Sequence, residues 1–402
     1  MTTGNFDLEH RLNEHRSANL MRNLEPAESI GARSRFLTRR TDEGAKFGSE
    51  EKIFASNNYL GLISDKRVRQ AAEEAIRNVG SGTGASRLLT GDTDLHHTLE
   101  QEIAECKETE KVLVFSSGYA ANVGTIAALE PDLVFSDELN HASIIDGCRL
   151  ADAETVVYDH CNTGDLATKM SDATTNREPN ERWLVITDTV FSMDGDIAPL
   201  KQLCDVAERY NAWIMADEAH ATGLFGNGGG IIQREGLEDR IDVQVGTLSK
   251  ALASQGGYVA GNKTLIKYLI NNARSFMFST GLAPPAVGAA YKALKIARNG
   301  NRTEQLWENV EHLRSGLTSA GYEVLGNSHI LPVMIGDRKK ALEIGRKVRK
   351  QGIVAPPIRP PTVPEGTSRI RITPMATHDK SDIETCIKAF RKAGEDTEVI
   401  SA

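Results

Sequence analysis

The chain has 402 residues, with 47 lysines and arginines against 55 aspartates and glutamates, and a formal net charge of −8. Hydrophobic residues make up 40% and charged residues 25%, which is typical of a globular protein and excludes a disordered chain. At about 150 residues per domain, the length predicts two or three domains. The mixed, slightly acidic charge excludes a basic protein built around nucleic acid, so we expect no nucleic-acid partner.

The cysteines and the N-terminus indicate a cytoplasmic protein. The five cysteines lack C-x-x-C spacing, so the sequence predicts neither disulfides nor a metal site. Residues 1–9 lack a basic segment followed by an apolar run, so no signal peptide is expected. The longest charge-free run, 112–129, contains polar residues and glycines, so no membrane span is expected.

The first predicted elements are an amphipathic helix over 7–23, a charged arm over 33–52 and a helix over 64–79. Short apolar strands then alternate with helices up to about residue 262. The predicted strands are 112–115, 133–135, 155–158, 183–187, 213–216 and 243–245, and the helices between them are 94–108, 119–129, 143–151 and 199–210. Because these strands are apolar on both faces, they predict a parallel-rich sheet covered by helices on both sides.

The last hundred residues have a different pattern. Predicted helices at 303–320, 338–351 and 379–394 are interleaved with strands near 323–326, 330–335 and 369–373. This pattern indicates a smaller α+β domain. We therefore expect an N-terminal helix and arm over 1–50, a large α/β domain over 51–290 and a small C-terminal domain over 291–402.

A lysine follows one of the predicted strands directly. Lys250 ends the segment 246–250 after strand 243–245, and small residues surround it. Desolvation at the end of a buried strand would lower its pKa and make it a nucleophilic amine, which a Schiff base requires. The alternative is a lysine in a surface turn.

Two other strand ends carry polar groups. The segment 116–122 opens a helix after a strand, where free backbone N–H groups and the helix dipole suit a phosphate. Asp217 and His220 follow strand 213–216, and an aspartate there can pair with a protonated ring nitrogen. The alternatives are a plain β–α turn and a helix cap. Asp188 and His141 likewise follow predicted strands, 183–187 and 133–135, so they are expected at the same edge of the sheet.

Two nucleotide-binding interpretations compete with this one. The tetrapeptide 217–220 occurs in helicases, but no upstream phosphate loop ending in Gly-Lys-Ser/Thr accompanies it. The glycine clusters at 80–84 and 226–230 lack the G-x-G-x-x-G spacing between a strand and a helix. We expect both clusters to be turns.

Pyridoxal phosphate requires the groups described above: a phosphate cradle, an aromatic contact to its ring, an acid for its ring nitrogen and a lysine that forms a Schiff base. From about residue 20 to 395 the sequence resembles the α-oxoamine synthase group of fold-type I pyridoxal-phosphate enzymes. The matching segments are 56–62, 82–87, 117–122, 140–143, 190–196, 217–220 and 246–250. The resemblance implies the aspartate-aminotransferase-like fold, with a large parallel-rich α/β/α domain and a small C-terminal α+β domain.

The resemblance also implies roles for individual residues. Lys250 would bind the cofactor and later take the α-proton of the amino acid, Asp217 would hold the pyridinium nitrogen, and His141 would stack on the ring. His220 would lie near the phenolic oxygen and Asn57 near the lysine. The other implied cofactor contacts are Gly118, Tyr119, Ser192 and Thr247, together with Ser279 and Thr280, which would reach the phosphate across a homodimer interface.

Within this group, the segment 358–367 resembles the biotin-pathway members that join L-alanine to a pimeloyl thioester. Arg359 would then bind the carboxylate of the amino acid, Thr362 would contact substrate, and Arg22 would meet the distal carboxylate of the acyl chain. The acyl carrier could be CoA or a carrier protein. Glycine with acetyl-CoA and serine with a long acyl-CoA are alternative substrate pairs. A non-catalytic partner subunit is an alternative of another class, which the intact Lys250 does not favour.

The sequence departs from the group at three places. Asp188-Thr189 stands where Glu-Gly is common, Ala253-Ser254-Gln255 follows the lysine where a glycine is usual, and Gly281 replaces a usual serine.

Overall fold

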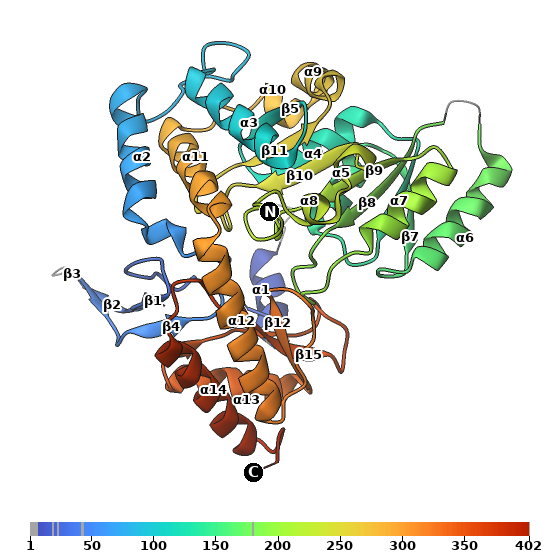
Figure 1. Ribbon diagram of the computed structural model, residues 1–402. Helices are drawn as coiled ribbons and strands as arrows, with labels where there is room; N and C mark the ends of the chain where they lie inside the picture. Colours follow the sequence, from blue (N-terminus) through green and yellow to red (C-terminus); the bar gives the residue numbers. More distant parts are fainter. Residues whose placement is uncertain (1–6, 18–19, 22–23, 42–43, 179–180, 402) are drawn as a thin grey trace, which may run out of the picture.

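The computed structural model describes residues 7–17, 20–21, 24–41, 44–178 and 181–401. A seven-stranded sheet with the order β5-β11-β10-β9-β8-β6-β7 forms the centre of its larger part (Figure 1). The strands are β5 (Lys111–Phe115), β6 (Leu133–Asp137), β7 (Glu154–Tyr158), β8 (Trp183–Asp188), β9 (Trp213–Asp217), β10 (Val243–Thr247) and β11 (Gly257–Gly261). From β7 to β10 neighbouring strands are parallel, whereas β11 is antiparallel to both of its neighbours. The predicted parallel-rich sheet is confirmed.

Helices cover both faces of this sheet. Alternate residues of a strand point to opposite faces, so Val185 joins one apolar cluster and its neighbours Leu184 and Ile186 join the other. One face is covered by α4 (Gly118–Leu129), α5 (Ala142–Leu150), α9 (Lys263–Asn272) and α10 (Arg274–Met277). The other is covered by α3 (Asp94–Lys107), α6 (Thr163–Ala173), α7 (Leu200–Arg209), α8 (Ile231–Glu235) and α11 (Pro284–Arg298), with α2 (Lys66–Asn78) packed on α11.

A smaller sheet with the order β12-β15-β14 forms the C-terminal part (Figure 1). Its elements are β12 (Leu331–Gly336), β14 (Pro357–Ile358), β15 (Ser368–Ile372), α12 (Asn301–Ser319), α13 (Arg338–Lys350) and α14 (Lys380–Glu395). The N-terminal elements are α1 (Leu8–Ser17), β1 (Arg33–Ser34), the hairpin of β2 (Leu37–Thr41) and β3 (Gly44–Phe47), and β4 (Glu51–Ile53). Because β4 pairs with both β1 and β13 (Ile353–Val354), the arm is joined to the C-terminal part. The domain boundaries at 50 and 290 stay predictions.

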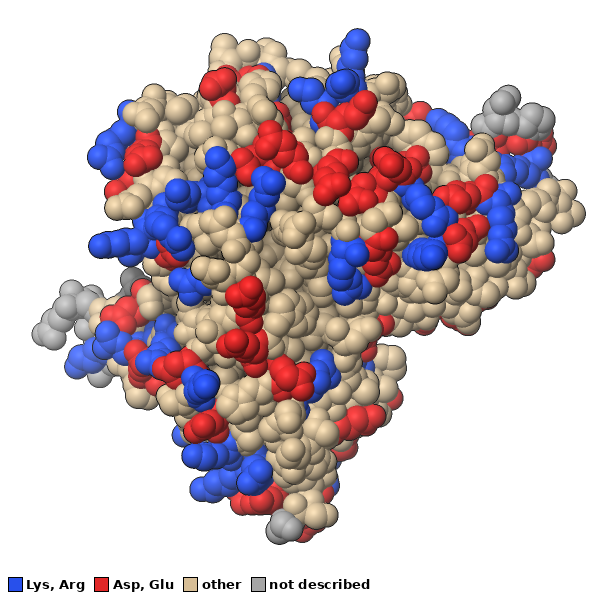
Figure 2. All heavy atoms as spheres, viewed as in Figure 1, with Lys and Arg blue, Asp and Glu red and all other residues tan. Residues whose placement is uncertain are grey.

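The secondary structure differs from the prediction in a few places. Strand β11 was not expected, because its ends are glycines and its short apolar run resembles a turn. The expected strand near 323–326 is reduced to one bridge between Val324 and Val333. Of the expected helix over 7–23, the structure describes Leu8–Ser17 as helical. Among the described residues, no helix has the length and apolar character needed to cross a bilayer. On the face shown in Figure 2, basic and acidic side chains are interspersed.

One of the three departures in sequence has a local structural cause, and a second has a structural cost. A Cβ atom on Gly281 would lie 2.8 Å from the backbone oxygen of Gly91, so a serine does not fit there without movement. Ala253 has a φ of 53°, in the left-handed region that glycine adopts without strain and alanine does not. The backbone of Ala253, three residues after Lys250, is therefore strained.

Replacing this alanine by glycine should stabilise the protein. Ala253→Gly removes a left-handed strain of ~1–2 kcal/mol and adds a backbone entropy cost of ~0.5–1 kcal/mol. The free energy of unfolding in urea should thus rise by ~0.5–1 kcal/mol. Ala251→Gly, at a buried position without positive φ, should instead lower it. A loss of stability in Ala253→Gly would contradict this account of the strain.

Candidate active site

The structure brings eight of the predicted site residues to one cavity of about 220 Å³. The cavity lies where β8, β9 and β10 end and where α4 begins, because parallel strands place their carboxyl ends at one edge of a sheet. The eight predicted residues that line it are Gly118, Tyr119, His141, Ser192, Asp217, His220, Thr247 and Lys250, and the other lining residues are Ser117, Ser143, Asp188, Ala219 and Ser249.

Asp217 places a buried carboxylate in this cavity. Its side chain accepts hydrogen bonds from Asn122 Nδ2 at 2.7 Å and from the backbone N–H of Ala219 at 2.8 Å. The residue is only 5% exposed, so its charge is shielded from water. Two donors and burial fix the carboxylate in one orientation, as an acid that must hold a ring nitrogen requires.

A chain of hydrogen bonds runs behind the lysine. The hydroxyl of Tyr59 donates to Asn57 Oδ1 at 2.9 Å, so at 2.7 Å it must accept from His220 Nδ1. His220 Nε2 is then free to accept a hydrogen bond from Lys250 Nζ at 2.7 Å. Burial and the positive charge of Lys250 lower the pKa of His220 well below its ordinary value. The imidazole is therefore neutral, with its proton on Nδ1.

Burial changes the acid–base chemistry of the lysine as well. Desolvation lowers the pKa of Lys250 to about 8, although the negative charges of Asp217 and Asp188 oppose the shift. Near neutral pH the amine is thus a mixture of its charged and neutral forms. A neutral amine is the form that can attack a carbonyl carbon or accept a proton.

His141 is fixed at the start of α5 by two contacts. Its backbone N–H donates to Asp188 Oδ2 at 2.9 Å, and its Nδ1 lies 2.7 Å from Ser143 Oγ. Burial and the neighbouring charge of Asp217 raise the pKa of Asp188 well above its ordinary value, and burial lowers the pKa of His141. The aspartate noted above as a departure thus positions the predicted stacking residue.

The first turn of α4 offers a site for an anion. Ser117 caps the helix by accepting from the backbone N–H of Ala120 at 3.0 Å, and the helix begins at Gly118. The positive end of the helix dipole and free N–H groups face the cavity. Tyr119 donates its hydroxyl proton to Asp146 at 2.6 Å. Together with the acid, the imidazole and the amine, this cradle fits pyridoxal phosphate.

The remaining predicted residues lie outside this cavity. Ser279 and Thr280 line a separate small pocket beside Arg87, and Thr280 is bridged to Ser86. Arg359 lines a groove of about 690 Å³, and Thr362 is exposed near this arginine. Asn57 accepts the hydrogen bond of Tyr59 and so belongs to the hydrogen-bond chain behind Lys250. Arg22 lies outside the described residues.

Sequence reasoning missed several residues that support the site. Tyr59 and Asn122 lie inside segments that matched the family, where each position could have been weighed for a role. Arg371 could have been found from β15, where Arg369 and Arg371 alternate with isoleucines in a strand that is buried throughout. Arg371 donates to the backbone oxygen of Ser192 at 2.5 Å and to Asn57 Oδ1 at 3.2 Å. Arg371 therefore lies beside the hydrogen-bond chain that runs from Asn57 to Lys250.

The glutamate of the helicase-like tetrapeptide has a structural role. Glu218 points away from the cavity and forms a fully buried ion pair with Lys107. Its other oxygen accepts from the backbone N–H of Ile232 at 3.0 Å. Both carboxylate oxygens are thus occupied, and neither is free for a metal-bound nucleotide.

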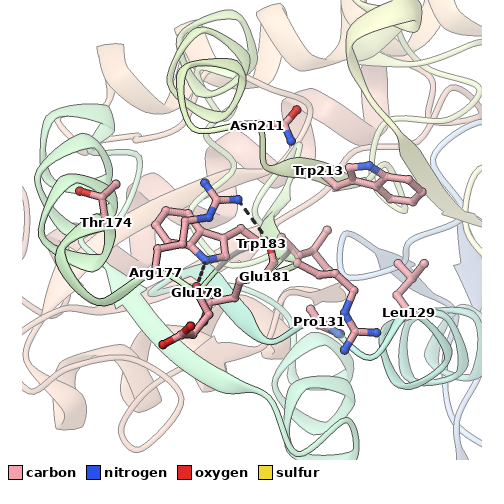
Figure 3. Close-up of a pocket in the computed structure, with 11 residues that line it drawn as sticks. Leu129, Pro131, Thr174, Arg177, Glu178, Glu181, Trp183, Asn211 and Trp213 are labelled. Carbon is pink, nitrogen blue, oxygen red and sulfur yellow. Dashed lines mark hydrogen bonds between the residues drawn. The ribbon is translucent and has the colours of Figure 1, made fainter.

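A larger hollow of about 870 Å³ lies at the opposite edge of the sheet, where β8 and β9 begin (Figure 3). The guanidinium of Arg177 lies over the Trp183 ring at 4.1 Å and donates to the backbone oxygen of Tyr210 at 2.6 Å. The indole N–H of Trp183 donates to Glu181 at 2.9 Å. These polar groups pair with one another, and the side chains drawn in Figure 3 include no lysine, histidine or cysteine.

Comparisons with known proteins agree with this geometry. Residues 52–390 match the family "Aminotransferase class I and II". The chain is 45% identical over 370 residues to an 8-amino-7-oxononanoate synthase of Lysinibacillus sphaericus, covering 91% of this chain and 94% of the relative. It is 41% identical to 8-amino-7-oxononanoate synthase 2 of Bacillus subtilis, with 98% of both chains covered.

Solved structures with the same fold include a serine palmitoyltransferase of Sphingomonas wittichii, with a TM-score of 0.89, 30% identity and full coverage of both chains. A serine palmitoyltransferase variant from S. paucimobilis with a bound PLP–myriocin aldimine has a TM-score of 0.88 at 31% identity, with 98% of both chains covered. An 8-amino-7-oxononanoate synthase of Francisella tularensis has a TM-score of 0.71 at 25% identity, covering 86% of this chain and 98% of that one.

The chain therefore belongs to the aminotransferase class I and II family and has the fold-type I architecture of pyridoxal-phosphate transferases. Within that family its relatives place it among the α-oxoamine synthases.

A glycine of β11 controls the shape of the phosphate cradle. A Cβ atom on Gly257 would lie 2.5 Å from the backbone nitrogen of Gly118, so Gly257→Ala must push the start of α4. We expect about a tenfold or greater loss of affinity for pyridoxal phosphate, measured by titration of the cofactor-free protein. Gly31→Ala, whose nearest atom would be 3.9 Å away, is the matched control. Equal affinity in both variants would contradict the assignment.

The lowered pKa of Lys250 predicts a pH profile. Only the neutral amine is nucleophilic, so the rate at which cofactor-free protein captures pyridoxal phosphate should rise with pH and level off above a midpoint of about 8. The measurement is the change in visible absorption after mixing at each pH. An unperturbed lysine would give a midpoint near 10.4 instead, and that result would contradict the burial argument. Lys250→Ala should show no such change.

Proposed function

We propose that the protein catalyses the decarboxylative condensation of L-alanine with a pimeloyl thioester, giving 8-amino-7-oxononanoate, free thiol carrier and CO2 in biotin biosynthesis. The observation that carries the proposal is the joint placement of Lys250, Asp217 and His141 in one cavity of an α-oxoamine synthase fold. The names of the relatives at 41–45% identity support the choice of substrates. CoA or a carrier protein would bear the acyl group.

Pyridoxal phosphate is the cofactor, and when bound it supplies an electron sink for the carbanion that the amino acid forms. The buried carboxylate of Asp217 would hold the ring nitrogen in its protonated form, because loss of that proton would leave the negative charge without a partner. His141, which lines the cavity, would stack on the ring and exclude water from it. The neutral His220 hydrogen-bonds Lys250 and orients its amine.

Lys250 then acts as the general base. With a pKa of about 8, its amine can take the α-proton of L-alanine and return a proton to the product at the same carbon. The arginine beside this base is a candidate for substrate binding. Arg371 is fixed by Ser192 and Asn57, and it is close enough for its charge to act on Lys250, so its remaining donors can hold the α-carboxylate. Arg359 stays a second candidate for that role.

The active unit is proposed to be a homodimer. Ser279 and Thr280 lie outside the cavity of their own chain, so Ser279 of the partner subunit and Thr280 of the partner subunit would complete its phosphate site.

Serine palmitoyltransferase chemistry is the second candidate function, favoured by the TM-scores of 0.88–0.89. A cytoplasmic location is proposed, because all five thiols are free.

Turnover of a substrate panel tests the proposal. We expect kcat/KM for L-alanine with pimeloyl-CoA to exceed that for glycine with acetyl-CoA, or L-serine with palmitoyl-CoA, at least tenfold, because one methyl group in a fitted pocket is worth about 1–3 kcal/mol. The measurement is release of the free thiol, with the product identified by mass. A preference for glycine or serine would contradict the proposal and assign the protein another activity of the α-oxoamine synthase group.

A control variant separates amino-acid binding from thioester binding. Arg371→Lys keeps the positive charge but loses the planar fork, so KM for L-alanine should rise about tenfold or more while KM for the thioester stays nearly constant. The same comparison for Arg359→Lys shows which arginine holds the α-carboxylate.

A further inference from the structure

A second cluster of reactive side chains lies behind the proposed active site. Asp137 ends β6, His160 and Cys161 follow β7, and Asp196 lies in the loop between β8 and α7. Ligand atoms of Asp137, His160 and Cys161 all lie within 4.8 Å of one another. None of these four residues lines the cofactor cavity.

Three donor atoms of different chemistry face a common point. His160 Nε2 lies 3.7 Å from Cys161 Sγ and 2.6 Å from Asp196 Oδ2, and the sulfur lies 3.7 Å from the same carboxylate oxygen. Tetrahedral zinc with ordinary bond lengths separates sulfur from nitrogen or oxygen by about 3.6 Å and nitrogen from oxygen by about 3.3 Å. The sulfur distances already match, and the nitrogen–oxygen pair needs to open by about 0.7 Å.

The residues around His160 hold its imidazole in the way that a metal ligand requires. Asp137 Oδ1 lies 2.8 Å from His160 Nδ1, which is the carboxylate–histidine arrangement that orients a metal-bound imidazole. The ring of Phe191 packs edge-on against His160 at 4.3 Å. The second carboxylate oxygen of Asp196, Oδ1, is buried and has no hydrogen-bond partner. An acceptor without a donor in this position is a separate sign that a cation belongs there.

We propose that His160, Cys161 and Asp196 bind a zinc ion, with Asp137 holding the imidazole from behind. An imidazole, a thiol and a carboxylate suit zinc, whereas magnesium and calcium prefer oxygen ligands only. Three protein ligands leave the fourth position to water. This assignment differs from the expectation of no metal site, which rested on cysteine spacing, because the ligands come from two separate loops and include only one cysteine.

The binding step releases two protons and changes no oxidation state. Zinc forms bonds to the sulfur, to Nε2 and to a carboxylate oxygen, while the thiol proton and the Nε2 proton leave to solvent. Burial opposes protonation of His160, but its hydrogen bonds to Asp137 and Asp196 outweigh that effect and raise its pKa to about 12. Zinc must displace that proton, so the bound ion replaces an existing ion pair.

The ion would connect the loop that carries Ser192 to the loop after β7. Asp196 lies in the same loop as Ser192, which lines the cofactor cavity, and this loop is closed by the bridge between Val190 and Ile197. The other two ligands lie directly after β7. A zinc ion would therefore fix the Ser192 loop against the sheet.

Metal retention tests the proposal. The protein with its cofactor is incubated with zinc chloride, dialysed against metal-free buffer, and its zinc content is measured by mass spectrometry. We expect about one zinc per chain and a melting temperature a few degrees higher than without zinc. Cys161→Asn should lose both effects, and it should fold because asparagine tolerates the φ of 54° at this position. His160→Gln should also lose the zinc.

A matched control removes a thiol elsewhere. Cys204→Ser lies at a buried position on α7 and should retain zinc like the parent chain. Cadmium gives a second readout, since its thiolate band in the far ultraviolet should appear in the parent and in Cys204→Ser but not in Cys161→Asn. The proposal is overturned if the parent retains no more zinc than Cys161→Asn does, or if the cadmium band persists without Cys161.

Discussion

The site is organised around the buried carboxylate of Asp217 at the end of β9. A negative charge that is shielded from water requires a positive partner within a few ångströms, and the parallel register places Lys250 just beyond the neighbouring strand β10. The same register sets Asp188 beside Asp217, and burial together with that neighbouring charge raises the pKa of Asp188 well above its ordinary value. The neutral His220 and the lowered pKa of Lys250 follow from the same burial.

The C-terminal part of the chain is tied to this site by two arginines of one strand. Arg369 pairs with Asp194, and Arg371 donates to the backbone oxygen of Ser192, so both hold the loop after β8. Arg371 also contacts Asn57 from the segment before α2. Three distant parts of the sequence therefore meet at the lysine, and loss of a buried charge from this network would cost about 3–5 kcal/mol. The position of the loop depends on the small sheet as much as on the large one.

Much of this arrangement could be predicted from local sequence. Apolar runs gave the parallel strands, and polar residues just after them gave Asp217, His141 and Lys250, because strand ends converge at one edge. Strand β11 could not be predicted in this way, since Gly257 allows close packing against Gly118 and does not form a turn. The link from His220 through Tyr59 to Asn57 depends on contacts across 161 residues of sequence, which no local pattern reports.

The most direct test of the account is the visible absorption spectrum of the purified protein with pyridoxal phosphate, recorded before and after addition of L-alanine, glycine or L-serine. The account predicts a visible band from cofactor bound to an amine, absent in Lys250→Ala, that responds at the lowest concentration to L-alanine. A protein without this band, or a band that survives in Lys250→Ala, would contradict the assignment of the lysine and of the cavity around it.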